Sequence, residues 1–78
     1  MTNQEKYIAA FTDALNVAAE ETAAMQYGQS VAWDSVGHMR LIANLEDAFD
    51  IMMDMDDIID FSSFGKGKEI LRKYDVEL

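Results

Sequence analysis

A serine and a histidine lie close together near the middle of the chain, where they could take part in chemistry. Ser35 follows Asp34, and His38 comes three residues later, so on a helix Ser35 and His38 would share one face. A serine at a helix start can carry a group on its hydroxyl, but Ser and Asp are also the residues preferred as helix N-caps. The Asp34-Ser35 pair alone is therefore open to both interpretations.

A Ser-His hydrolase is the first chemistry to consider for this pair. The chain has no Gly-x-Ser-x-Gly motif and no evident acid that could orient His38. A chain of 78 residues can also hardly enclose a substrate pocket. We therefore expect no catalytic residue and no enzyme activity, and we expect His38 on the surface of its helix, where it could contact a partner.

The composition excludes several classes of protein. The 78 residues are expected to form one domain, 1–78, and they include no cysteine, so neither disulfides nor thiolate metal sites can form. Half of the residues are hydrophobic, which indicates a folded core. No apolar run approaches the roughly 20 residues of a membrane span, and the first residues do not resemble a signal peptide. We expect a soluble, cytoplasmic protein without membrane insertion.

Negative charge is concentrated in one part of the chain. The net charge is −9, which argues against nucleic acid as a partner and favours a monomer. Residues 46–60 include seven acids and no base. Such a run is often only a solvated face, but it can also steer basic partners to a docking surface, which we favour here. The run lacks the alternating oxygen ligands, central glycine and final glutamate of an EF-hand, so we expect no metal site.

The spacing of apolar residues predicts four helices and no strand. The helices are expected over about residues 3–20, 35–50, 56–60 and 63–74. The fold class is therefore all-α: a small four-helix bundle with three longer helices and one short helix. The connection over residues 22–33 includes Gly28, Gln29 and Ser30, and the residues expected to anchor it to the core are Met25, Tyr27, Val31 and Trp33.

Some residues favour the last predicted helix and others disfavour it. Ser62 or Ser63 can serve as its N-cap. Gly65 and Gly67 lie inside it, and each glycine costs roughly 1 kcal/mol relative to alanine in a helix interior. We expect this helix to fray first.

The stretch WDSVGHMRLIANLEDAFDI, from Trp33 to Ile51, combines the Asp-Ser pair with regularly spaced apolar and acidic residues. The pattern consists of Val36, Met39, Ile42, Leu45, Glu46 and Phe49, and it continues at Phe61, Ser62, Ser63 and Phe64. Over about residues 33–64 this pattern resembles the acyl carrier protein family. The resemblance implies the four-helix fold of that family and a 4'-phosphopantetheine arm on Ser35, with Asp34 capping the helix and presenting the serine.

The same resemblance implies partners. A phosphopantetheinyl transferase would supply the arm from coenzyme A, and enzymes with basic docking surfaces would load and accept acyl groups held as thioesters. Aminoacyl, peptidyl or D-alanyl carriers, and an unmodified acidic helical adaptor, are the alternatives. The residues expected to contact partners are Val36, His38, Met39, Arg40, Glu46, Asp47, Asp54, Asp56 and Asp57.

Methionine is frequent in and after the second predicted helix. Apolar residues at this spacing usually form ordinary core, but methionine is also adaptable enough to let an interior open around an acyl chain. If the protein shelters its cargo in this way, the residues expected to line the cavity are Met39, Ile42, Leu45, Met53 and Phe61.

Overall fold

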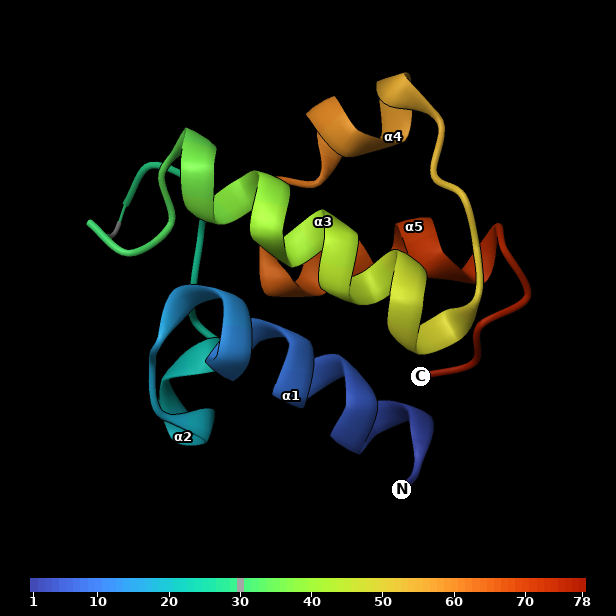
Figure 1. The fold of residues 1–78 in the computed structure, drawn as a ribbon, viewed down its shortest axis with the longest axis horizontal. Coiled ribbons are helices and arrows are strands. Elements are labelled where there is room, and N and C mark those ends of the chain that lie inside the picture. Colours follow the sequence, from blue (N-terminus) through green and yellow to red (C-terminus); the bar gives the residue numbers. More distant parts are fainter. Residues whose placement is uncertain (30) are drawn as a thin grey trace.

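The computed structural model describes residues 1–29 and 31–78, so Ser30 of the predicted connection lies outside the described residues. The described residues form five helices, which follow one another in this order (Figure 1): α1 (Asn3–Leu15), α2 (Ala19–Thr22), α3 (Ser35–Phe49), α4 (Met55–Asp60) and α5 (Phe64–Arg72). Within the described part of the chain there is no strand, only an isolated antiparallel bridge between Gln26 and Ser63. The predicted all-α class is confirmed, although the helices number five instead of four.

The first helix ends earlier than predicted. It begins at a capping box in which the Thr2 hydroxyl accepts from the Glu5 backbone N–H at 3.1 Å, and the Glu5 carboxylate accepts from the Thr2 N–H at 2.8 Å. It ends at Asn16, whose φ of 56° is left-handed. Asparagine tolerates this conformation better than most residues. The prediction of one helix over 3–20 was therefore wrong, and the chain turns before it forms the short helix α2.

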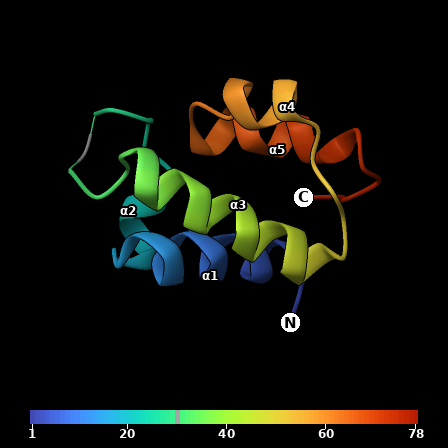
Figure 2. The same ribbon diagram turned by 45° about the horizontal axis from the view of Figure 1, so that its top comes forward.

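Helix α3 lies at the centre of the fold. It has α1 on one side and α4 with α5 on the other, as two views of the ribbon agree (Figure 1 and Figure 2). The two long helices α1 and α3 pack directly against each other. Gly37 permits this close packing, because a Cβ at that position would lie 2.6 Å from the Ala32 carbonyl oxygen and 2.9 Å from Leu15 Cδ2. The predicted span of α3, about 35–50, is confirmed to within one residue.

Aromatic rings fill the core between these layers. Trp33, Tyr7, Phe11 and Phe61 are fully buried. The Phe11 ring meets Trp33 edge-on, with their centroids 5.3 Å apart, and Phe61 lies 6.2 Å from Phe11. The hydroxyl of Tyr7 donates to the Phe64 carbonyl at 2.6 Å, which satisfies its buried polar atom. Burial raises the pKa of Tyr7, so this phenol stays protonated.

The connection before α3 is anchored by two of the four predicted residues. Met25 and Trp33 are buried in the core. Val31, by contrast, is 98% exposed, and Tyr27 is 43% exposed. The backbone of this segment provides further anchoring, because the Tyr27 N–H donates to the Ser62 carbonyl at 2.8 Å and the Phe64 N–H donates to the Met25 carbonyl at 3.2 Å. These two bonds place Tyr27 beside the segment that joins α4 to α5.

Helix α5 begins at the predicted serine and ends earlier than expected. Ser63 is the N-cap, and its hydroxyl accepts from the Lys66 backbone N–H at 3.0 Å. The helix stops at Arg72, and the turn after it ends at Asp75, which has a left-handed φ of 64°. The prediction over 63–74 therefore included the terminal turn.

An ionic cluster joins α4 to the end of α5. The Asp57 side chain is only 7% exposed and accepts from Lys73 Nζ at 2.5 Å and from the Tyr74 hydroxyl at 2.6 Å. The Tyr74 oxygen in turn accepts from the Asp54 backbone N–H at 2.9 Å. These bonds, from Lys73 first and then Tyr74, lower the pKa of Asp57.

This cluster predicts a specific pH dependence of stability. Because the folded-state pKa of Asp57 lies below its ordinary value of 3.8, its contribution is fully present above about that pH and is lost as the pH falls through the lower, folded value. Asp57→Asn should therefore lower the melting temperature at neutral pH, and its difference from the wild type should shrink below pH 4. Circular dichroism melts across the acid range measure this difference.

Asp56→Asn is the matched control for this experiment. Asp56 lies in the same first turn of α4 but is exposed, so its substitution should change the melting temperature little at any pH. Equal effects of the two substitutions would contradict a stabilising role for the Asp57 cluster.

Candidate functional site

Asp34, not Ser35, caps helix α3. The Asp34 backbone is extended, with φ −102° and ψ −170°, and its Oδ1 accepts from the Gly37 N–H at 2.8 Å. Ser35 is the first helical residue and is exposed, and within residues 1–29 and 31–78 its hydroxyl forms no hydrogen bond. The sequence left both residues as possible caps, and the structure assigns this role to Asp34. The Ser35 hydroxyl is therefore accessible to another molecule.

Ser35 lies at the edge of an apolar groove of about 340 Å³. The groove is open to solvent, and its lining consists of Tyr27, Ser35, His38, Met39, Ile58, Ile59 and Phe61. A second, shallower hollow extends from Ser35 along the outer surface of α3, past Val36, Met39, Arg40 and Ala43. The exposed serine thus borders apolar surface on two sides.

A larger hollow of about 550 Å³ lies elsewhere, between α1 and α3. It includes the polar side chains of Lys6, Asp13 and Asn44, and Ser35 does not line it. The groove beside Ser35 is the better candidate because it joins an apolar lining to an accessible hydroxyl.

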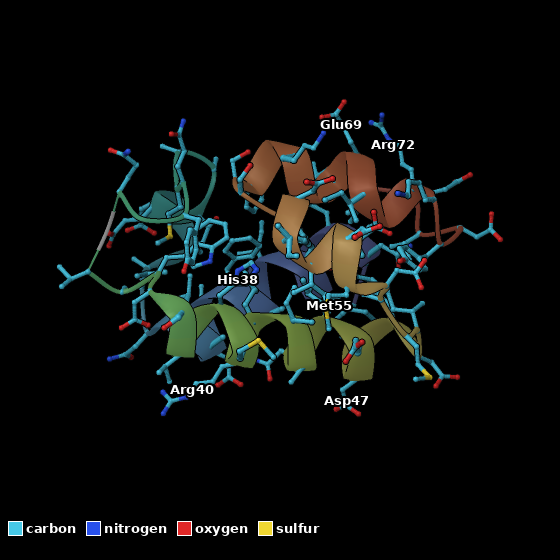
Figure 3. The ribbon with its side chains drawn as sticks, turned by 90° about the horizontal axis from the view of Figure 1, so that it is seen from above. His38, Arg40, Asp47, Met55, Glu69 and Arg72 are labelled. Carbon is cyan, nitrogen blue, oxygen red and sulfur yellow. The ribbon has the colours of Figure 1, made fainter. Side chains whose placement is uncertain are left out.

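His38 is held in place by two hydrogen bonds. The Trp33 indole N–H donates to His38 Nδ1 at 2.9 Å, and His38 Nε2 lies 2.8 Å from the Ile58 carbonyl oxygen. Because an indole can only donate, Nδ1 must be the acceptor, so Nε2 carries the proton and donates to Ile58. His38 therefore connects α3 to α4 and to the buried Trp33, and its half-buried ring points inward from α3 (Figure 3).

This geometry corrects the expectation that His38 lies on a docking surface. Both of its ring nitrogens are occupied within the protein. The ring also packs edge-on against Tyr27, with centroids 5.1 Å apart, and against Phe61, with centroids 6.2 Å apart. Neither nitrogen reaches the Ser35 hydroxyl in a hydrogen bond, so His38 does not act as its base.

Most of the other expected docking residues are exposed. Val36 and Met39 are 60% and 59% exposed, and Arg40 and Asp47 project from one side of α3 (Figure 3). Asp54 and Asp56 are exposed around the start of α4. These residues are spread over the helices that flank the groove.

Two of the expected docking acids have internal partners instead. Asp57 is buried and bonded to Lys73 and Tyr74, so its inclusion in the docking surface was wrong. Glu46 is half-buried, and its Oε2 accepts from the Met53 backbone N–H at 2.9 Å, which holds the chain after α3. The acidic residues of this part of the chain are therefore of two kinds: some are exposed, and others accept hydrogen bonds from within the protein.

The residues expected to line an acyl cavity are also divided. Met39 and Phe61 do line the groove beside Ser35. Ile42, Leu45 and Met53 are buried members of the packed core and do not border this groove. Tyr27, Ile58 and Ile59 also line the groove and were not predicted, although the two isoleucines stand out as an apolar pair inside an acidic segment.

No three His, Asp or Glu side chains in the described part of the chain are grouped so that they could hold a metal ion. None of its helices combines the length and the apolar character that crossing a membrane requires.

Comparisons with known proteins give no family for this chain: no family model, no curated protein and no solved structure matches it. Any function must therefore be argued from the residues and geometry around Ser35.

Proposed function

We propose that this protein is a carrier that holds acyl groups as thioesters on a 4'-phosphopantetheine arm attached to Ser35. The observation that carries the proposal is the position of Ser35: it is exposed, it is the first residue of α3, and it is released from capping by Asp34. The sequence pattern over residues 33–64, which resembles acyl carrier proteins, is the second support.

The residues around Ser35 fit such an arm. The N-terminal end of α3 has the positive end of the helix dipole, which suits the negative charge of a phosphodiester on Ser35. The apolar groove that begins at Ser35 offers contact surface to a neutral chain leaving that phosphodiester. When attached, the arm supplies a terminal thiol that holds an acyl group as a thioester.

Attachment requires little chemistry from the protein itself. The Ser35 oxygen would form a bond to the phosphorus that carries pantetheine in coenzyme A, the pyrophosphate bond would break, and adenosine bisphosphate would leave. The serine proton would pass to a base of the transferase, since His38 is engaged elsewhere. Ser35 needs only exposure and a defined backbone position, which the Asp34 cap provides.

The surface near the groove supports docking of transferases and acyl-processing enzymes. The exposed side chains of α3 include the apolar Val36 and Met39 and the acidic Asp47, and Asp56 is exposed on α4. A net charge of −9 attracts basic surfaces at long range, while a small apolar contact gives short-lived binding. This combination suits a carrier that must visit several enzymes.

The test is the intact mass of the protein after incubation with coenzyme A, Mg²⁺ and several phosphopantetheinyl transferases. We expect the mass of one phosphopantetheine group to be added, and Ser35→Ala to prevent it. No addition with any transferase would favour an unmodified acidic adaptor. If the arm is added, loading by an acyl-transferring enzyme or by an amino-acid-activating enzyme distinguishes an acyl carrier from an aminoacyl carrier.

A further inference from the structure

The groove beside Ser35 ends at a barrier of hydrogen bonds. His38 lies at its inner side, bonded through Nδ1 to Trp33 and through Nε2 to the Ile58 carbonyl of α4. An acyl chain that entered the protein between α3 and α4 from Ser35 would have to separate His38 from Ile58. Such a separation would leave a partly buried carbonyl and an imidazole N–H without their hydrogen bond, which costs stability.

Rigid aromatic side chains pack against His38. Trp33 and Phe61 are fully buried. The centroids of their rings lie 6.3 Å apart, and the Phe11 ring packs against both. Aromatic rings have few rotatable bonds and cannot collapse as methionine can. The flexible side chain of Met39 lines the same groove as Ser35 and is exposed to solvent.

The size of the groove limits what it can hold. Its volume of about 340 Å³ is near the lower end of the range of about 300–1,000 Å³ for small-molecule sites. Because Ser35 lines the groove, the part of any attached chain nearest to the serine occupies it first. The space that remains suits one compact group and not a long alkyl chain.

On the basis of the proposed function, we infer that this carrier presents compact acyl groups in the open groove and does not enclose long chains in its core. His38 is the specificity-determining residue, because its bridge between Trp33 and Ile58 closes the route from Ser35 to the interior. This role is consistent with the buried positions of Ile42 and Leu45, which would otherwise meet an enclosed chain.

The experiment compares chain lengths on the wild-type protein. A phosphopantetheinyl transferase attaches the arm from acetyl-, octanoyl- and dodecanoyl-coenzyme A, intact mass verifies each product, and circular dichroism gives each melting temperature. We expect the three wild-type products to melt at the same temperature, because the added methylenes stay in water. A melting temperature that rises steadily with chain length would overturn the inference, since it reports burial of the chain.

Two variants test the role of His38. His38→Ala removes the bridge, so its acetyl form should be less stable than wild type but its melting temperature should rise along the series. Glu69→Ala changes an exposed residue of α5 that does not line the groove and should behave as wild type. If His38→Ala shows no dependence on chain length, His38 does not close the route. Failure of every transferase to add mass would instead refute the carrier function itself, and the inference with it.

Discussion

Ser35→Ala is expected to abolish attachment of the phosphopantetheine arm while leaving the stability of the protein almost unchanged. Attachment needs the hydroxyl oxygen, and alanine has none. Stability should change by less than about 0.5 kcal/mol, because Ser35 is exposed, its hydroxyl has no partner within the described residues, and alanine is well accepted in a helix. Intact mass and urea unfolding measure the two effects separately.

Asp34→Ala, at the neighbouring residue, is the matched comparison. We expect it to lower the stability of the protein and still to allow attachment of the arm. Loss of the 2.8 Å bond from the Gly37 N–H should cost about 1 kcal/mol of stability, which is typical of a lost N-cap. The arm should still be attached, although more slowly, because the start of α3 frays without its cap. A normal mass increase in Ser35→Ala would exclude Ser35 as the attachment site, and a stability loss as large as that of Asp34→Ala would show that Ser35 contributes to the cap.

Most of the helices could be predicted because they depend on local signals. The start of α3 follows from Asp34, whose side chain caps the helix through a residue three positions ahead. The end of α1 was missed because Ala18 and Ala19 continue its apolar spacing, whereas the left-handed backbone of Asn16 interrupts the helix before them. Asparagine occurs in many conformations, so its presence alone did not mark the boundary.

The roles of His38 and Asp57 could not be predicted, since both depend on residues distant in the sequence or in the fold. Helical spacing shows which face His38 occupies, but the Ile58 carbonyl that binds it lies 20 residues away. Asp57 is one of several similar acids, and only the approach of Lys73, 16 residues later, distinguishes it from exposed Asp56. Residue type and spacing therefore predict which face of a helix a side chain occupies. They do not predict which distant residues contact that side chain in the folded protein.

The role of Gly67 also could not be predicted from the sequence, and it has a larger expected effect on the stability of the protein. Helix propensity treats Gly65 and Gly67 alike, as positions where alanine would stabilise α5 by up to about 1 kcal/mol. In the structure a Cβ at Gly65 would have no neighbour within 4 Å, whereas a Cβ at Gly67 would overlap the Phe61 ring and the Tyr7 hydroxyl. The smallness of Gly67 lets α5 pack against two fully buried aromatic residues.

Gly67→Ala is therefore expected to destabilise the protein strongly, while Gly65→Ala stabilises it slightly. The new methyl group must displace Phe61 or Tyr7, and overpacking of this kind costs about 1–3 kcal/mol or more. Displacement of Tyr7 would also strain its 2.6 Å hydrogen bond to the Phe64 carbonyl. At about 0.05–0.15 kcal/mol per residue, a chain of 78 residues has a total stability of only about 4–12 kcal/mol.

Urea unfolding of the two alanine variants, followed by circular dichroism, measures this contrast. The midpoint should fall for Gly67→Ala and rise for Gly65→Ala, although the two substitutions add the same methyl group to the same helix. Equal midpoints would mean that α5 does not pack closely on Phe61 and Tyr7. Because Phe61 also forms part of the groove beside Ser35, a folded Gly67→Ala variant should in addition alter that groove, which links the packing of α5 to the site.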